Sequence, residues 1–359
     1  MISYFLAFLL AFGVAAALTP LVRRAALRWG IVDEPTGGRK IHTRATPLLG
    51  GLGVFGAFTL IVLGYTLATD QLFGGYLLPK HVAGLILGGA ILMIGGYLDD
   101  RHHLRPSRQI LFPIAASLVI IASGIGVEYI RNPFGEAIQL DAVKWAIFEW
   151  NGVPYSLTLF ADLFALVWLL GMMYTTKFLD GLDGLVPGVG VIGSVILFFL
   201  SLSKEVAQPE TALLAIIFAG ACLGFLVWNW HPAKIFLGEG GSLFVGFLLG
   251  VLAIISGAKV ATALLVMGVP ILDVLWVIVR RLWTRTSVAV GDRKHLHFRL
   301  LDAGLSHRAA VCVLYLITIA FGVSSLFLET SEKVKAFAVL GGMMLALILS
   351  LTILYKRKK

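Results

Sequence analysis

Charged residues are scarce in this 359-residue sequence: Asp, Glu, Lys and Arg make up 14% of it, whereas hydrophobic residues make up 58%. Soluble domains usually carry about a quarter charged residues, so the composition excludes an ordinary soluble protein. The mean hydropathy of +0.92 predicts a polytopic membrane protein. Internal repeats, low-complexity tracts and polar stretches long enough for a separate soluble domain are absent, so we expect one domain covering residues 1–359.

Cysteine is also rare. Cys222 and Cys312 both lie inside apolar runs, which is typical of small buried hydrophobic residues rather than of a metal or redox site. The first apolar run has no basic residue before it and no small-residue cleavage site after it. It therefore predicts a retained membrane span rather than a signal peptide.

Long apolar runs are abundant. A helix needs roughly 20 apolar residues to cross about 30 Å of hydrocarbon, so the sequence predicts an all-α integral membrane protein with about eleven transmembrane helices. The 40 glycines suit close helix packing in lipid. The predicted spans are 2–22, 49–68, 82–98, 109–125, 157–176, 185–202, 210–228, 242–257, 261–279, 310–328 and 336–355.

Lys and Arg fall mostly on one side of these spans. That side holds 22 of the 29 basic residues, in the segments 23–48, 99–108, 177–184, 229–241, 280–309 and the C-terminal tail. The positive-inside rule assigns it to the cytoplasm, with the N-terminus outside and the C-terminus cytoplasmic. The net charge of +9 is thus mainly a topology signal, and we expect no nucleic-acid partner.

Five carboxylates fall at the predicted cytoplasmic ends of spans. Asp99 and Asp100 close the third span, Asp180 and Asp183 close the fifth, and Glu239 opens the eighth. One such acid is usually a solvated helix cap, but five at one depth favour a shared polar cleft. Carboxylate oxygens are the ligands that Mg²⁺ prefers, often together with substrate phosphates; Mn²⁺ is an alternative.

Basic residues and histidines occupy loops on the same side. The positive-inside rule explains the Lys and Arg residues without any function, but not His295 and His297. A His-x-His pair offers too few ligands for zinc, so a phosphate or proton role is favoured. Metal-holding acids beside anion-holding cations at a lipid surface indicate phosphoryl chemistry on an amphiphilic substrate.

The order of these motifs resembles the polyprenyl-phosphate N-acetylhexosamine-1-phosphate transferases, from Val32 to about Ser306. Eleven spans resemble the bacterial branch that primes O-antigen, teichoic-acid and related glycans more than the ten-span branch. The matching motifs are Val32-Asp33, Pro35 with Arg39-Lys40-Ile41-His42, Pro47 with Gly50-Gly51, Asp99-Asp100, Asp180-Gly181-Leu182-Asp183-Gly184-Leu185, Asn229 with Pro232-Ala233-Lys234-Ile235-Phe236, Gly238 with Gly241-Ser242, Pro270 with Asp273, and Asp292-Arg293-Lys294-His295-Leu296-His297.

The resemblance implies that a polyprenyl phosphate, undecaprenyl phosphate in bacteria, attacks the β-phosphate of a UDP-N-acetylhexosamine and releases UMP. N-acetylglucosamine is the default sugar; N-acetylgalactosamine or a modified hexosamine fits the same residues. The location implied is the bacterial cytoplasmic membrane, with the site facing the cytoplasm. A homodimer is left open. Asp273 is expected to partner a bundle or loop contact.

The resemblance also implies residue roles. The expected catalytic residues are Asp99, Asp100, Asp180 and Asp183, of which Asp99 and Asp100 would activate or orient the lipid phosphate. The expected metal ligands are Glu239 and Asp100. Asp183, Asn229 and Phe236 would hold the uridine, and the loop 293–297 would grip the diphosphate or the sugar. The expected substrate-binding residues are Lys40, His42, Arg44, Lys177, Asn229, Lys234, Phe236, Arg293, Lys294, His295, His297 and Arg299.

The chain departs from the family pattern at several positions. Glu239 stands where the family has a metal-binding aspartate, and Lys177 stands where it has an asparagine that can also contact the metal. Tyr174 replaces a second asparagine, Gln109 a basic residue, and Leu48 an arginine. A compensated exchange, in which the Lys177 ammonium takes over part of the metal's charge at Glu239, is one interpretation. The alternative is that Glu239 binds Mg²⁺ normally and Lys177 contacts a phosphate.

Two other classes of function compete with the transferase. Acids in membrane proteins can line ion paths, which would suit a transporter or channel, but these acids gather at one face and no inverted repeat is visible. The changes at Glu239 and Lys177 also keep open an inactive homologue that acts as a lipid-binding scaffold. Release of UMP that depends on polyprenyl phosphate separates the transferase from both.

Overall fold

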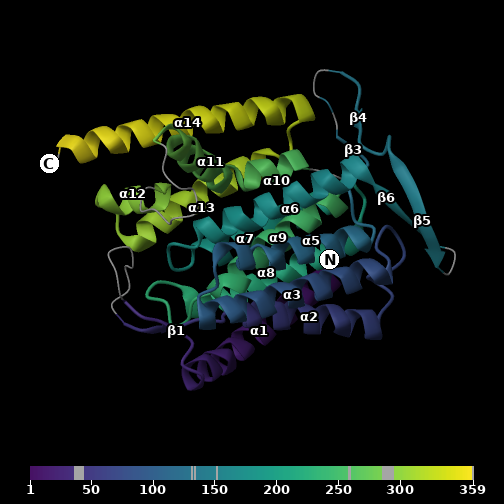
Figure 1. Ribbon diagram of the computed structural model, residues 1–359, viewed down its shortest axis with the longest axis horizontal. Coiled ribbons are helices and arrows are strands. Elements are labelled where there is room, and N and C mark those ends of the chain that lie inside the picture. The colour runs from purple at the N-terminus through teal and green to yellow at the C-terminus, as the bar shows by residue number, and fades with distance from the viewer. Residues whose placement is uncertain are drawn as a thin grey trace.

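The structure is a computed structural model, and it describes residues 1–35, 44–130, 132, 135–150, 153–257, 260–284 and 295–357. The predicted site residues Lys40, His42, Arg293 and Lys294 lie outside these ranges. Helices dominate the chain (Figure 1). They are α1 (Ile2–Arg28), α2 (Gly51–Ala68), α3 (Pro79–His102), α4 (Pro106–Gln109), α5 (Leu111–Ala122), α6 (Leu159–Leu179), α7 (Leu185–Leu202), α8 (Pro209–Asn229), α9 (Gly238–Ile255), α10 (Val260–Val266), α11 (Gly268–Trp283), α12 (Leu296–Asp302), α13 (His307–Ser324) and α14 (Thr330–Arg357).

The structure does not confirm the predicted count of eleven membrane spans. Within the described ranges eight helices are long and apolar enough to cross a membrane, or nine if α10 and α11 form one broken span. The predicted span 109–125 contains α5, whose 12 residues cover only about 18 Å. The predicted span 261–279 bends by 78° between α10 and α11, because Pro270 cannot extend a helix toward its N-terminal side. The predicted span 336–355 lies within α14.

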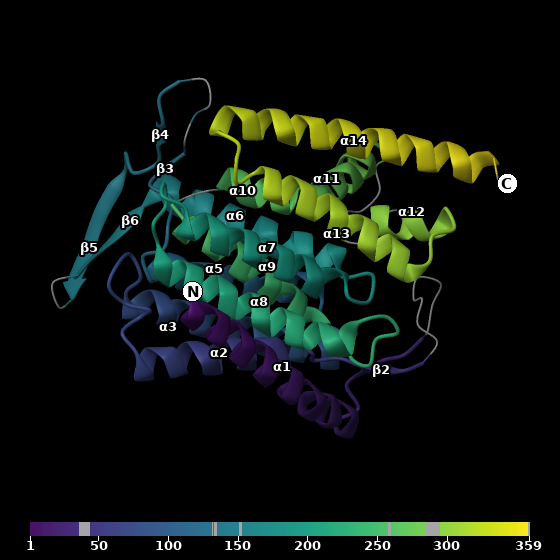
Figure 2. The ribbon, with the colours of Figure 1, turned by 180° about the vertical axis from the view of Figure 1, so that it is seen from behind.

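Short strands mark the two ends of the helix bundle. Strand β1 (Val32–Asp33) pairs antiparallel with β2 (Thr46–Pro47) near α12 at one end. At the other end β3 (Tyr129–Ile130) pairs with β4 (Ile138–Gln139), and β5 (Lys144–Trp150) pairs with β6 (Val153–Thr158). Figures 1 and 2 show the N-terminus toward the β5–β6 end and the end of α14 at the opposite one. The two termini thus lie toward opposite ends of the bundle, whereas the assignment of either end to the cytoplasm stays a prediction.

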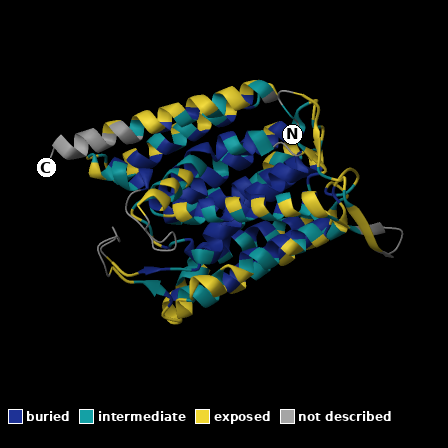
Figure 3. Ribbon diagram, turned by 45° about the horizontal axis from the view of Figure 1, so that its top comes forward, coloured by how far each residue is buried: buried dark blue, intermediate teal, exposed yellow. Residues whose placement is uncertain are grey.

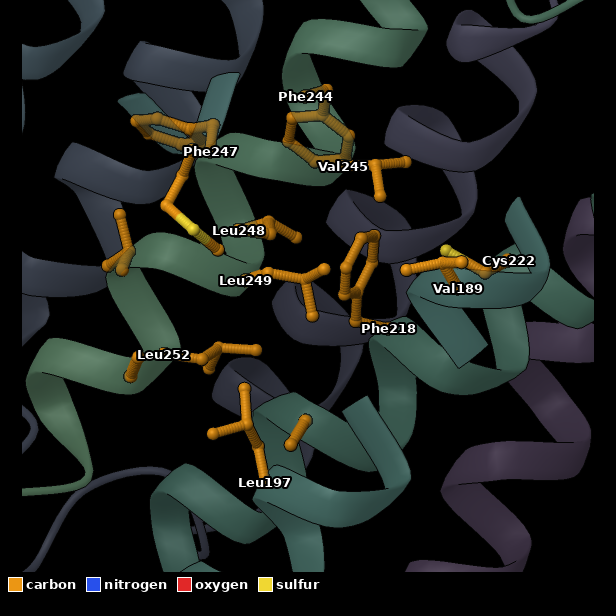
Figure 4. Close-up of a cluster of buried hydrophobic side chains, with 14 of the residues drawn as sticks. Val189, Leu197, Phe218, Cys222, Phe244, Val245, Phe247, Leu248, Leu249 and Leu252 are labelled. Carbon is orange, nitrogen blue, oxygen red and sulfur yellow. The ribbon is translucent and has the colours of Figure 1, made fainter. Parts of the chain in front are cut away.

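Helix α9 forms the centre of the packing. It contacts α6 and α3, while α8 packs against α1 and α7. Every residue of α9 except Glu239 is buried, and Figure 3 shows exposure concentrated on the outer helices. In Figure 4 Phe218 of α8 and Phe244 of α9 meet inside the core, with ring centroids 5.9 Å apart in an edge-to-face arrangement.

The two cysteines have different environments. Cys222 is buried in the α7–α8–α9 core, as predicted, whereas Cys312 on α13 is exposed. The prediction that both are buried is therefore wrong for Cys312. Its apolar run places it in a span, but the outward face of that span is not covered by protein.

Glycines bring three helices together at the start of α9. A Cβ on Gly96 of α3 would collide with the Gly240 backbone, and one on Gly51 of α2 would collide with Gly241. Gly238 has a φ of +74°, and a Cβ there would collide with the Asp100 carboxylate. Only glycine readily adopts a positive φ and also lacks the Cβ for which there is no space. These contacts place the end of α3 directly against the first turn of α9.

Candidate active site

The structure brings the five predicted carboxylates into one cluster. Asp100, on the last turn of α3, accepts the backbone N–H of Glu239 at 3.2 Å from Oδ1 and 3.3 Å from Oδ2. It lies within electrostatic reach of Asp99, Asp180 and Glu239, and Asp180 also interacts with Asp183. The Asp100 carboxylate therefore sits at the positive N-terminal end of α9, where the helix dipole stabilises an anion.

A chain of side-chain contacts crosses this cluster. Asp99 Oδ1 accepts hydrogen bonds from the Leu104 backbone N–H at 2.8 Å and from Gln109 Nε2 at 2.7 Å. Gln109 Oε1 in turn accepts a bond from Lys177 Nζ at 3.1 Å. Lys177 Nζ lies 2.5 Å from Glu239 Oε1. Helices α3, α4, α6 and α9 are thus linked through polar side chains.

The turn between α6 and α7 carries Asp180 and Asp183. Asp180 is the C-cap of α6, with its backbone N–H bonded to the Thr176 carbonyl at 3.1 Å. Gly184 then begins α7 with a φ of +82°, a conformation that favours glycine. The sharp turn therefore places Asp180 and Asp183 together between the end of α6 and the start of α7.

Asp183 is held by the loop that joins α8 to α9. Its Oδ2 is 2.7 Å from His231 Nδ1 and accepts the Ala233 backbone N–H at 3.1 Å. His307 of α13 stacks on His231, with ring centroids 3.9 Å apart and planes at 14°. Ligand atoms of these three residues lie within 4.8 Å of one another. These three described residues are thus close enough together to hold a metal ion.

Asn229 links two segments of the site through its side-chain amide. Its side chain is buried: Oδ1 accepts the Gly184 backbone N–H at 2.8 Å, and Nδ2 donates to the Ile235 carbonyl at 2.8 Å. Its predicted contact with the uridine stays a prediction. Asn229 joins the Asp183 turn to the α8–α9 loop.

The remainder of the α8–α9 loop is aligned against the start of α2. Phe236 donates its backbone N–H to the Pro47 carbonyl and accepts the Gly50 N–H, both at 2.9 Å; its side chain is half-buried. Lys234 is exposed, and its ammonium lies 5.0 Å from the Trp228 ring centroid. The substrate contact expected of Lys234 stays a prediction; in the structure its ammonium lies over the Trp228 ring of α8.

The predicted histidine pair packs beneath the Asp180–Asp183 turn. His295 Nδ1 is 2.7 Å from Asp273 Oδ2, and Asp273 Oδ1 accepts the Leu296 backbone N–H at 2.8 Å. Asp273 therefore makes the loop contact expected of it. His297 is buried against Gly181, and neither ring nitrogen has a hydrogen-bond partner in the described part of the chain. Burial lowers the pKa of His297 to about 4, so the ring is neutral near pH 7.

Arg44 and Arg299 are the two remaining predicted binding residues within the described ranges. Arg44 is exposed two residues before β2, and Arg299 is half-buried on α12. Three residues of the site were not predicted: His231, His307 and, as a bridge, Gln109. His231 adjoins the Pro232 motif, but nothing in the sequence indicates that His307, 76 positions later, stacks on it.

The fold and the site together define a multi-pass membrane protein with a carboxylate cluster where several spans end. The chain belongs to glycosyl transferase family 4, whose pattern matches residues 82–257. It is 30% identical over 337 residues to a Bacillus subtilis protein named "Probable undecaprenyl-phosphate N-acetylglucosaminyl 1-phosphate transferase", covering 92% of this chain and 86% of that one. It is 31% identical to the Mycolicibacterium smegmatis "Decaprenyl-phosphate N-acetylglucosaminephosphotransferase", covering 96% and 88%. A Desulforamulus reducens "Phospho-N-acetylmuramoyl-pentapeptide-transferase" is 28% identical over 339 residues.

The predicted Mg²⁺ site can be tested against this donor set. Carboxylate oxygens suit Mg²⁺, and Asp100 and Glu239 are adjacent as predicted. However, Glu239 Oε1 already contacts the Lys177 ammonium. An ammonium donates hydrogen bonds and cannot ligate a metal, and it repels a nearby divalent cation. The residues present therefore do not fit a divalent ion held by Glu239.

Proposed function

We propose that this enzyme transfers N-acetylglucosamine-1-phosphate from UDP-N-acetylglucosamine to a polyprenyl phosphate, and that undecaprenyl phosphate is the acceptor. The observation that carries the proposal is the carboxylate cluster at the ends of α3 and α6 and the start of α9, in a chain of this family. The apolar helices give a lipid acceptor access to that cluster from the bilayer.

The reaction forms one P–O bond and breaks another. A phosphate oxygen of the lipid attacks the β-phosphorus of the sugar nucleotide. The bond from that phosphorus to the oxygen that bridges the two phosphates breaks, and its electron pair leaves with UMP. Asp99 and Asp100 would orient the lipid phosphate, and Asp183 and Phe236 would hold the uridine. No water takes part, so the lipid phosphate must reach the phosphorus in line with the leaving oxygen.

Topology and metal dependence belong to the same proposal. We place the cluster on the cytoplasmic face of the bacterial inner membrane, because most Lys and Arg residues flank that end. The homodimer stays a prediction, whereas the Mg²⁺ or Mn²⁺ requirement expected from the sequence is in question, because the Lys177 ammonium already contacts Glu239. Among the described residues, Lys177 places a positive charge directly against the cluster.

The test is an assay of the purified protein in detergent with UDP-N-acetylglucosamine and undecaprenyl phosphate. We expect UMP release that requires the lipid, together with a lipid diphosphate sugar identified by mass spectrometry. A panel containing UDP-N-acetylgalactosamine and UDP-glucose defines the sugar specificity. A transporter or an inactive scaffold would release no UMP under any of these conditions.

A further inference from the structure

Lys177 is the meeting point of four departures from the family pattern. Its Nζ lies 2.5 Å from Glu239 Oε1 and 3.1 Å from Gln109 Oε1, and it stands over the Tyr174 ring at 5.4 Å from the centroid. The other three departures are Tyr174, Gln109 and Glu239. They come from three different helices, and all of them contact the Lys177 ammonium. The four exchanges therefore form one local unit.

The Lys177 ammonium is fixed in place rather than loosely solvated. Its side chain is 20% exposed and that of Glu239 is 14% exposed. Two of its three N–H donors are directed at Glu239 and Gln109, and the aromatic face supports the charge from another side. A cation held in this way faces a cluster of carboxylates and needs no bound ion to neutralise Glu239.

The Gln109 amide transmits this arrangement to Asp99. Its carbonyl oxygen accepts from Lys177, so its NH₂ group must face Asp99 and Leu104, to which it donates at 2.7 Å and 3.0 Å. The orientation of Asp99 thus depends on the charge at position 177. A divalent ion at Glu239 would have to displace the ammonium and disturb that orientation.

We propose that Lys177 is a fixed cation that takes the place of a divalent metal ion at Glu239 and thereby sets the divalent-cation requirement of the transfer. The role of this cation in turnover rests on the proposed function; its exclusion of a metal ion from Glu239 does not. Glu239 is then the anchor of Lys177 and not a metal ligand.

The first test measures metal binding without turnover. Mn²⁺ is titrated into the purified full-length protein, and free Mn²⁺ is followed by electron paramagnetic resonance. We expect equal Mn²⁺ binding by the wild type and by Glu239→Gln, whereas Lys177→Asn binds an ion about 10- to 100-fold more tightly. Lys177→Arg is the matched control, because it retains the charge and should behave as the wild type does.

Two results would overturn the proposal. One is a Mn²⁺ site in the wild type that Glu239→Gln removes. The other is a folded Lys177→Asn protein with no gain in Mn²⁺ affinity. If Lys177→Asn does not fold, the comparison of the wild type with Glu239→Gln still decides. The double variant Lys177→Asn with Glu239→Asp then supplies a second protein, in which the carboxylate at position 239 has lost its ammonium partner and should gain the ion.

The second test applies a chelator to the UMP-release assay. The wild type should retain most of its turnover in excess EDTA, and EDTA should lower the turnover of Lys177→Arg by no larger a factor. Lys177→Asn with Glu239→Asp should instead need added Mg²⁺. Full inhibition of the wild type, reversed by Mg²⁺, contradicts the fixed-cation role. Absence of UMP release under every condition contradicts the proposed function instead, and leaves the Mn²⁺ titration to decide the present inference.

Discussion

Asn229 Oδ1 accepts the backbone N–H of Gly184 at 2.8 Å, and this bond joins the turn that carries Asp183 to the end of α8. The other end of the same amide donates to the Ile235 carbonyl. Because Asn229 is buried, both backbone groups depend on one side chain. The relationship shows how one buried side-chain amide fixes two backbone segments of the site.

Asn229→Ala should therefore destabilise the protein before it affects chemistry. It leaves a buried N–H and a buried C=O without their partner, at a cost of about 1–3 kcal/mol each. We expect the free energy of unfolding in mixed micelles to fall accordingly. Gln71→Ala, at an exposed turn residue, is the control and should change little. An Asn229→Ala protein as stable as the control would show that the two bonds contribute nothing.

Asp99→Asn should remove turnover while preserving the fold. The amide oxygen can still accept from Leu104 and Gln109, so the geometry persists, but the negative charge is lost. We expect UMP release to fall by about 100-fold or more, with an unchanged melting temperature. Asp70→Asn changes an exposed acid after α2, away from the cluster, and should leave turnover intact. Comparable activity in the two variants would remove Asp99 from the site.

Gln109→Arg should impair the enzyme, because it sets a second cation beside the Lys177 ammonium, which now lies 3.1 Å from the Gln109 carbonyl oxygen. Combining Gln109→Arg with Lys177→Asn moves the single positive charge back to position 109. We expect the double variant to exceed Gln109→Arg in UMP release by roughly tenfold, corresponding to a coupling of about 1.4 kcal/mol. Additive losses would mean that the two positions act independently.

His297 should make the stability of the protein depend on pH. Burial lowers its pKa from 6.5 to about 4, so protonation favours the unfolded state. The stability that the neutral His297 ring contributes is complete above pH 6.5 and is lost as the pH falls toward 4. The free energy of unfolding lost in this way is at most on the order of 3 kcal/mol. Between pH 7 and pH 4.5, the melting temperature of His297→Gln should fall less than that of the wild type. Identical losses would show that His297 titrates normally.

Much of the site follows from the sequence because charge placement fixes topology. Asp99, Asp180 and Glu239 each stand at the end of an apolar run, so assigning the runs to one orientation already brings them to one membrane face. Lys177 and Glu239 both depart from the family pattern, and one of two interpretations of the sequence placed them next to each other. The ion pair between them supports that interpretation. Neither step requires knowledge of side-chain packing.

Other features depend on tertiary contacts that periodicity does not encode. Hydropathy cannot distinguish a straight span from the bent α10–α11 pair, because both are equally apolar. The motif around Lys234 does not reveal that its side chain turns outward over Trp228, while Asn229 turns inward. The stacking of His307 on His231 joins two segments through packing alone.

The most direct test of the central claim follows the β-phosphorus of the sugar nucleotide. UDP-N-acetylglucosamine labelled at that atom is incubated with the enzyme and undecaprenyl phosphate, and the lipid is then extracted. The account predicts that the label enters the lipid phase while unlabelled UMP stays in water. Label retained in water as UDP, with the sugar alone moving to the lipid, would contradict it.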